Sequence, residues 1–316
     1  MSKKRIWKIV LPGIIIIKII VIIGLLNAAF KEPEVKIIKE AAIYKGMILP
    51  DSLTFAGERV PLENFDIRES LERELLVNSY FHSQTIRFIK LAPRYFSIIE
   101  PILKEKGIPD DFKYLAVAES NLDPKAVSPA SAVGMWQFLK VTAREYGLEV
   151  ASEVDERYHL EKSTYAACDY LKSAYDKFGS WALVSAAYNA GRTFTVRQIT
   201  RQKTNNYFDM LLGEETARYV FRILALKMVL ENPEDYGFDI PNDQKYPIIP
   251  TQDIEIKGPV NDFADFAQEH GTNYKILKMF NPWLRENYLT NNTGKTYVIK
   301  IPVHGARNGS IDTIQE

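Results

Sequence analysis

Hydrophobic residues recur every three or four positions through the middle of the chain, between Asp66 and Leu230. This spacing places them on one face of a helix. Two such faces are formed by Ile67, Leu71, Leu75 and Leu76 and by Ile98, Ile99, Ile102 and Leu103. Pro93 suits the first turn of the second of these helices. No comparable run of alternating apolar and polar residues occurs here, so the segment is predicted to be all-α.

Three later helices are predicted together with their ends. Ser163 suits the N-cap of a helix whose apolar face continues to Phe178. Residues 181–189 are predicted to form a short buried helix, and Gly191 after it suits a left-handed C-cap. A long apolar helix is expected over residues 216–230, ending before Pro233.

The pattern changes after Pro233. Residues 253–257 and 297–301 alternate apolar and polar positions, as strands with one buried face do. Residues 263–269 and 274–280 lie between them and have helical spacing. The fold class predicted is therefore mainly α: a helical domain at 66–240 and a small α+β domain of βααβ order at 250–303.

The first thirty residues differ in kind from the rest. A basic start precedes an almost unbroken apolar run from Ile9 to Leu26, which is nearly long enough to span a bilayer. The positive flank predicts that the following chain crosses to the outside. Residues 1–30 are expected to be a signal peptide or a retained membrane anchor, and residues 31–65 a linker.

The composition excludes several classes of protein. Lys and Arg number 40, as do Asp and Glu, so the zero net charge gives no electrostatic indication of nucleic-acid binding. Cys168 is the single cysteine, which excludes intrachain disulfides and zinc sites built from several cysteines. The four histidines are scattered without ligand spacing, so neither a metal nor another cofactor is predicted. Nothing in the sequence indicates an oligomeric state.

Glu119 is the first candidate for chemistry. In a helix that begins near Pro109, the inward face carries Phe112, Leu115 and Ala116, and the next position on that face is Glu119. Burial raises the pKa of a carboxyl group, which allows a glutamate to act as a general acid near neutral pH. A structural glutamate bonded to nearby backbone is the alternative that periodicity alone leaves open.

Four motifs follow one another in a fixed order. Glu119 and Ser120 are followed by Ser128 and by the segment GMWQF at residues 134–138. AYNAG follows at residues 187–191, and ETARYV at residues 215–220. Over about residues 70–240 this set resembles the soluble-lytic-transglycosylase (SLT) catalytic domain of lytic transglycosylases, in the branch of the membrane-bound murein enzymes. Ser131 and Met135 depart from the residues common in that family.

The resemblance implies a lysozyme-like fold and a role for each matching residue. Glu119 corresponds to the single catalytic acid and base, and Tyr219 to a tyrosine that orients it. The substrate-binding residues that it implies are Ser120, Ser128, Met135, Gln137, Tyr188, Asn189, Glu215 and Tyr219. Two alternatives stay open: Ser120 capping its own helix and Tyr188 packing in the core.

The same resemblance implies the reaction. Such an enzyme cleaves the bond between N-acetylmuramic acid and N-acetylglucosamine in peptidoglycan without water and leaves a 1,6-anhydro sugar. Its partners would be peptidoglycan glycan strands and, through residues 1–30, the membrane, with the catalytic domain in the periplasm of the cell envelope. A lysozyme-like hydrolase and a non-catalytic peptidoglycan-binding scaffold are the alternatives.

The C-terminal βααβ unit resembles a LysM domain, which is a small glycan-binding module. Its two helical segments, at residues 262–267 and 277–282, carry residues similar to those of LysM helices. The usual Gly-Asp-Thr at the start of the first helix is replaced by residues 260–262, which read VND. A packing domain without affinity for glycan is the alternative.

Overall fold

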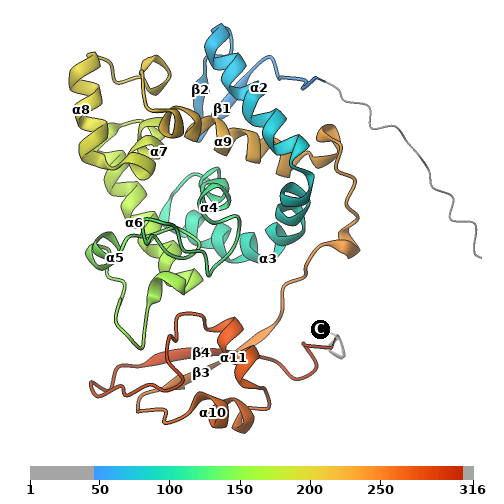
Figure 1. Ribbon diagram of the computed structural model, residues 1–316, viewed down its shortest axis with the longest axis vertical. Helices are drawn as coiled ribbons and strands as arrows, with labels where there is room; N and C mark the ends of the chain where they lie inside the picture. Colours follow the sequence, from blue (N-terminus) through green and yellow to red (C-terminus); the bar gives the residue numbers. More distant parts are fainter. Residues whose placement is uncertain (1–45, 309–316) are drawn as a thin grey trace, which may run out of the picture. The chain divides into compact units, whose positions relative to one another are not determined.

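The apolar periodicity in the middle of the chain produces helices in the computed structural model, which describes residues 46–308. The helices of this part are α2 (Phe65–Tyr80), α3 (His82–Lys106), α4 (Phe112–Ser120), α5 (Lys140–Glu145), α6 (Leu160–Phe178), α7 (Trp181–Ala190), α8 (Arg192–Gln202) and α9 (Glu214–Glu231). Short 3-10 turns occur at Glu156–Tyr158, Tyr207–Asp209, Pro233–Tyr236 and Asn242–Gln244. Between residues 66 and 230 the chain forms isolated bridges but no strand. The all-α prediction for this segment is confirmed (Figure 1).

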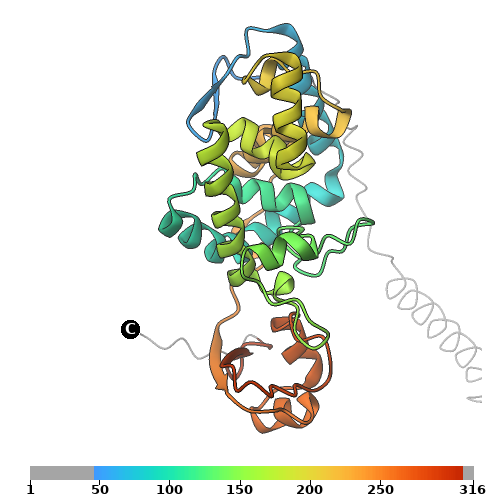
Figure 2. The same ribbon diagram turned by 90° about the vertical axis from the view of Figure 1, so that its left-hand side faces the viewer.

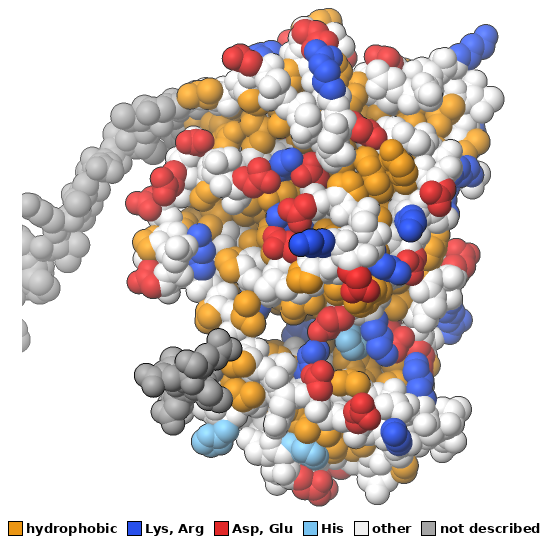
Figure 3. Space-filling view, turned by 180° about the vertical axis from the view of Figure 1, so that it is seen from behind, with side chains coloured by type: hydrophobic (Ala, Val, Ile, Leu, Met, Phe, Trp, Pro, Cys, Tyr) orange, Lys and Arg blue, Asp and Glu red, His pale blue; other side chains and the backbone are white. Residues whose placement is uncertain are grey.

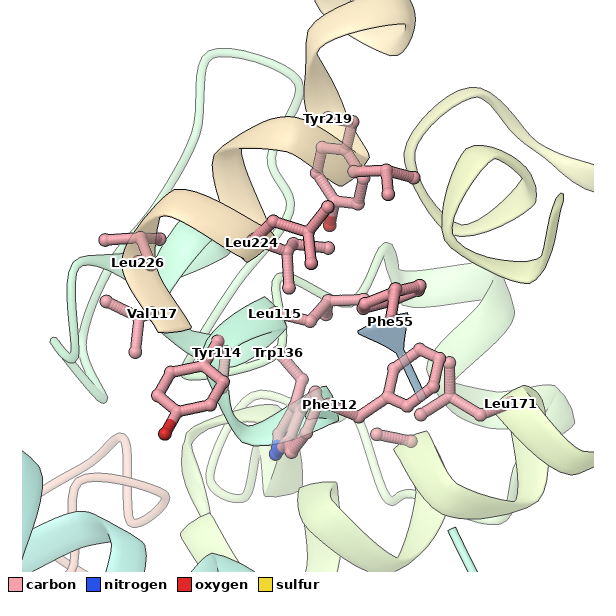
Figure 4. Packing of buried hydrophobic residues seen from close by; sticks show 14 of the residues in the cluster. Phe55, Phe112, Tyr114, Leu115, Val117, Trp136, Leu171, Tyr219, Leu224 and Leu226 are labelled. Atoms are coloured by element: carbon pink, nitrogen blue, oxygen red, sulfur yellow. The ribbon is translucent and has the colours of Figure 1, made fainter. Parts of the chain in front are cut away.

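Helix α4 lies at the centre of this domain and packs against α3 and α9. Its residues from Phe112 to Val117 are all buried. Figure 4 shows Leu115 of α4 beside Leu224 of α9, with Phe112 reaching toward Leu171 of α6. Burial of each such side chain stabilises the fold by about 1.5–3 kcal/mol. The last turn of α4 is thus held by a packed core on several sides.

Several helix ends differ from the sequence prediction. Pro93 lies inside α3 and not in a first turn, because α3 already begins at His82. The proline is on the exposed face of α3, where the carbonyl that loses its partner can reach solvent. Ser163 lies within α6, which begins at Leu160, and its hydroxyl donates to the Leu160 carbonyl at 3.2 Å. Gly191 ends α7 with φ 87° but ψ 145°, outside the left-handed helical region.

Part of the predicted linker folds onto the helical domain. The strands β1 (Leu53–Phe55) and β2 (Glu58–Val60) pair antiparallel, with Leu53 opposite Val60. Ala56 and Gly57 turn the chain with positive φ angles of 52° and 83°, as a two-residue hairpin requires. The side chains of Phe55 and Val60 are buried in the main core. Strands of three residues are too short to show an alternating pattern in the sequence.

The C-terminal domain has the predicted βααβ order. It consists of β3 (Thr251–Ile256), α10 (Phe263–Glu269), α11 (Tyr274–Phe280) and β4 (Tyr297–Pro302). The two strands pair antiparallel from Thr251 opposite Pro302 to Ile256 opposite Tyr297. Figure 2 shows this part of the chain in orange and red. In β4 every second side chain is buried, as the alternation predicted. These side chains belong to a second hydrophobic cluster, separate from that of the helical domain.

The surface carries both signs of charge. Figure 3 shows Lys and Arg side chains interspersed with Asp and Glu on the face in view. Between residues 46 and 308 no helix is long and apolar enough to cross a bilayer. The predicted anchor at residues 1–30 lies outside the described residues. Within the described part, no three His, Cys, Asp or Glu side chains are grouped as metal ligands.

Candidate active site

Glu119 lies in the last turn of α4, where the buried helix reaches the edge of the core. The helix ends there because Asn121 and Leu122 both take a left-handed conformation, each with φ 55°. The apolar face predicted for this helix is present, and the Glu119 side chain is half-buried at its end. Burial is the main cause that raises the pKa of Glu119, to about 7.

Tyr219 of α9 is the hydrogen-bond partner of Glu119. Its hydroxyl donates to Oε1 of Glu119, and its side chain is only 2% exposed. In Figure 4 the Tyr219 hydroxyl points from α9 toward the interior. This bond favours the carboxylate and lowers its pKa, as does the charge of Arg222, whereas the charge of Glu215 raises it. Burial outweighs the lowering effects, so both forms of Glu119 are populated near neutral pH.

Asn189 and Glu215 join the end of α7 to the start of α9. The Asn189 Nδ2 donates to Oε1 of Glu215 at 3.3 Å. The hydroxyl of Thr216 donates to Oδ1 of Asn189 at 2.8 Å, so both ends of the amide have a partner. Asn189 is half-buried and Glu215 is exposed. The structure therefore brings two of the predicted substrate-binding residues into direct contact.

Tyr188 holds a neighbouring segment in place. Its hydroxyl donates to the carbonyl of Trp136 at 2.6 Å. Its ring makes edge contacts with Phe138 and Tyr170, at centroid distances of 6.5 and 5.1 Å. Burial raises the pKa of Tyr188 well above the usual range, and the nearby charge of Glu119 acts in the same direction. Tyr188 thus packs against the core and is also a neighbour of Glu119.

The segment of residues 126–138, called the 126–138 loop below, forms a tight turn beside Tyr188. Ser128 Oγ accepts a hydrogen bond from the Ala132 amide at 3.1 Å. The Gln137 Nε2 donates to the Gly134 carbonyl at 2.9 Å and to that of Ala126 at 3.2 Å. Ser128 and Gln137, both predicted to meet the sugar, therefore also fix the backbone of this loop.

Ser120, next to Glu119 in the chain, contacts Met135 of the 126–138 loop. The Ser120 hydroxyl donates to the Ala116 carbonyl at 2.9 Å and lies 3.2 Å from the Met135 sulfur. Both side chains are buried, Met135 to 1% exposure. An enclosed side chain has little surface for a substrate to meet, so in this structure these two residues join the end of α4 to the 126–138 loop. The neighbouring Trp136 is also enclosed, and its Nε1 donates to Thr164 Oγ1 at 2.9 Å.

Gly134 has to be a glycine. Its φ is 84°, and a Cβ atom built on it would lie 2.0 Å from the carbonyl oxygen of Arg157.

Arg157 is one of three residues at or near the site to which the sequence analysis gave no role; the others are Thr216 and Arg222. Thr216 lies inside the ETARYV motif, and Arg222 follows Tyr219 by three positions on the same helix. Those positions are the signal from which Thr216 and Arg222 could have been identified.

The arrangement suits acid–base chemistry by one residue. Glu119 can give up or accept a proton near neutral pH, and Tyr219 fixes the direction of its carboxyl group. Asn189 and Glu215 supply polar groups at the edge of the site. A sugar or another polyhydroxylated substrate is the kind of ligand that such polar groups would hold.

Comparisons with known proteins identify two matching domains and a similar enzyme. Residues 96–211 match the transglycosylase SLT domain, and residues 252–305 match the soluble lytic transglycosylase C-terminal LysM-like domain. The membrane-bound lytic murein transglycosylase D of Escherichia coli strain K12 is 31% identical over 257 residues, which are 79% of this chain and 55% of the relative. The chain thus spans about half the length of this curated relative.

Two solved structures are also similar to the chain. The 70 kDa soluble lytic transglycosylase of Escherichia coli is 23% identical over 44% of this chain and 24% of its own, with a TM-score of 0.39. An inactive mutant of the lytic transglycosylase Slt from Pseudomonas aeruginosa is 20% identical over 50% of this chain and 28% of its own, with a TM-score of 0.35.

Proposed function

Because this chain belongs to the proteins that carry a transglycosylase SLT domain, we propose that it is a peptidoglycan lytic transglycosylase in which Glu119 serves as acid and base. One observation carries the proposal: the pKa of Glu119 is raised to about 7 beside the hydroxyl of Tyr219. A group with such a pKa both donates and accepts protons at neutral pH.

In the first step Glu119 protonates the glycosidic oxygen between N-acetylmuramic acid and N-acetylglucosamine. The bond between this oxygen and the muramyl anomeric carbon breaks, and positive charge develops on that carbon. The Glu119 carboxylate then takes the proton of the muramyl 6-hydroxyl, whose oxygen bonds to the anomeric carbon. Glu119 ends protonated, as it began, and no water is consumed.

The second step needs no strong external nucleophile. The attacking hydroxyl belongs to the same sugar, and well-oriented intramolecular attack reaches effective molarities of about 10⁵–10⁸ M. Most glycosidases use a pair of carboxylates. Here one carboxyl group alternates between its two forms, and Tyr219 holds it in line for both steps.

The test is product analysis after digestion of purified peptidoglycan. Anhydro-muropeptides are expected from the wild-type chain, and Glu119→Gln should lower their release by about 10²- to 10⁴-fold, because an amide cannot carry the catalytic proton. Products that contain one more water would indicate a lysozyme-like hydrolase. Substantial turnover by a folded Glu119→Gln variant would move the assignment to another carboxylate, Glu215 first.

We also propose that the chain works in the cell envelope and that residues 1–30 export or anchor it. The support is the basic flank before the apolar run from Ile9 to Leu26. Intact chain is expected in the membrane fraction, with the helical domain open to added protease on the outer side. Recovery of the intact chain from the soluble cytoplasm would contradict this proposal.

A further inference from the structure

The 126–138 loop holds an unfavourable backbone conformation beside the candidate acid. Ser131 and Gln137 are not glycines, yet their φ angles are 62° and 49°. Such conformations persist only where surrounding contacts determine them. On the inner side these contacts are made by Tyr188 and Ser120. A second set of contacts reaches the loop from its other side.

Arg157 makes this second set. Its Nη1 donates to the carbonyls of Ser131 and Phe138, both at 3.2 Å, and so joins two points of the loop that lie seven residues apart. Its Nε and Nη2 donate to the carboxylate of Asp155 at 2.9 and 2.7 Å. Arg157 and Asp155 are both buried. Only the planar, many-donor guanidinium can serve this carboxylate and both carbonyls at once.

The segment that carries Arg157 is itself docked on the C-terminal domain. The Asp155 amide donates to the Trp283 carbonyl at 2.9 Å, and the Glu153 carbonyl accepts from the Arg285 amide at 2.8 Å. The Glu153 carboxylate accepts from the Thr290 amide at 2.7 Å. These three hydrogen bonds attach residues 153–155 to the C-terminal domain.

Apolar packing strengthens the same attachment. Val154 and Tyr158 are buried in the hydrophobic cluster of the C-terminal domain, although they precede α6 of the helical domain in the chain. The guanidinium of Arg285 lies 4.0 Å from the centroid of the Tyr158 ring. Residues 153–158 therefore pack into one domain while Arg157 holds a loop of the other.

We propose that Arg157 is a positioning residue and that the C-terminal domain, through residues 153–158, keeps the 126–138 loop in the conformation that the reaction needs. This inference rests on the proposed function. It gives the C-terminal domain a part in turnover that is independent of any glycan it binds.

The test compares Arg157→Lys with Arg197→Lys, the same change on the exposed face of α8. Lysine keeps the charge beside Asp155 but cannot reach both carbonyls. With a short soluble glycan, kcat/KM of Arg157→Lys is expected to fall about 10- to 100-fold, since small displacements at an active site cost on that order. The alkaline limb set by Glu119 should stay in place, because Arg157 does not contact the acid. Arg197→Lys should match the wild type.

Hydrogen exchange tests the linkage without relying on activity. The amides of Val133, Gly134 and Phe138 are bonded inside the loop and should exchange faster in Arg157→Lys. They should also exchange faster in Glu153→Ala, which loosens the docking to Thr290. Glu255→Ala, an exposed change on β3, is the matched control.

The positioning role of Arg157 would be overturned if the loop amides of Arg157→Lys exchanged at the wild-type rate. It would also be overturned if they exchanged faster while kcat/KM stayed unchanged. If the loop amides of Glu153→Ala exchanged at the wild-type rate, the part assigned to the C-terminal domain would be overturned. If the wild-type chain released no sugar product, the proposed function would fail, whereas the exchange measurements would still decide whether the C-terminal domain holds the loop.

Discussion

At the scale of single residues, the carboxyl group of Glu119 is under two opposing influences. Burial disfavours its charge, while the Tyr219 hydroxyl and the Arg222 charge favour it. The result is a pKa near 7, against an ordinary value of 4.5. One unit of pKa corresponds to about 1.4 kcal/mol, so the ionised carboxylate costs the folded state about 3 kcal/mol. The protein accepts this cost at the residue that carries the proposed chemistry.

Glu119→Gln should therefore stabilise the fold in a pH-dependent way. The folded pKa is raised, so the wild type has its full stability below about pH 4.5 and loses part of it as the pH rises through 7. Glutamine stays neutral throughout and loses none. The free energy of unfolding of Glu119→Gln relative to wild type should rise by up to about 3 kcal/mol between pH 4 and pH 8. Urea unfolding at the two pH values measures this, and an equal difference at both would contradict it.

Tyr219→Phe and Glu215→Gln should move the alkaline limb of activity in opposite directions. The Tyr219 hydroxyl lowers the pKa of Glu119, so its loss should raise that pKa and shift the limb above pH 7. The Glu215 charge raises the same pKa, so its neutralisation should shift the limb below pH 7. Tyr219→Phe should also reduce turnover, though by less than Glu119→Gln, because the acid remains.

The measurement for this pair is kcat/KM on a soluble glycan across pH 4 to 9. Glu214→Gln is the matched control, since Glu214 is the exposed neighbour of Glu215 and pairs with Arg73 at 2.8 Å. If the alkaline limb shifted in the same direction in Tyr219→Phe and in Glu215→Gln, these two residues would not act on Glu119 as the structure indicates.

The sequence predicted Glu119 as the acid but did not predict all of the contacts around it. Glu119 could be found because it continues a helical apolar face and begins an ordered set of motifs. The role of Arg157 could not be predicted by the same reasoning, because its partners Ser131 and Phe138 are 26 and 19 residues away. Ser120 and Met135 matched motif positions, but only packing shows that both are enclosed. Sequence motifs can identify which residues belong to a site, but only the contacts formed in the folded chain show which of them are open to a ligand.

At the scale of elements, α10 and α11 have the predicted boundaries because each begins at a residue that caps it. Asp262 accepts from the Ala264 amide and Asn273 from the Ile276 amide. The start of α6 was missed because its N-cap is His159, which makes no side-chain cap. The hairpin β1–β2 was missed because its role is a tertiary one: Glu58 accepts hydrogen bonds from the Trp181 and Ala182 amides at 2.5 and 3.2 Å.

Glu58→Ala should destabilise the helical domain. The carboxylate satisfies amides at the start of α7 and also accepts from the Ser180 hydroxyl at 2.9 Å. Loss of a helix N-cap costs about 0.5–2 kcal/mol, and the charge at a helix start adds to this. The melting temperature should fall by several degrees, while Glu63→Ala, which breaks only an exposed pair with Arg59, should change it little. Equal melting of both variants would show that β2 does not cap α7.

At the scale of the whole molecule, the helical domain and the C-terminal domain have separate hydrophobic clusters, and Val154 and Tyr158, which precede α6, belong to the second. The sequence indicated two domains joined end to end. It could not indicate that a segment before α6 completes the core of the second, since Val154 and Trp283 are far apart in the chain. For this reason deletion of residues 250–303 would expose Val154 and Tyr158, and point variants are the better test of what the C-terminal domain binds.

A groove of about 410 Å³ lies where β3 leads into α10, and we expect it to hold glycan. Its walls include the polar side chains of Asn261, Asp265 and Glu269 and the ring of Phe266. Asp265→Ala removes an exposed hydrogen-bond acceptor from this wall without touching residues 153–158. It should weaken retention of the chain on insoluble peptidoglycan several-fold, yet leave kcat on a short soluble glycan unchanged. Gln268→Ala, an exposed change on the same helix outside the groove, should alter neither. Retention of Asp265→Ala equal to that of Gln268→Ala would leave the C-terminal domain with the positioning role alone.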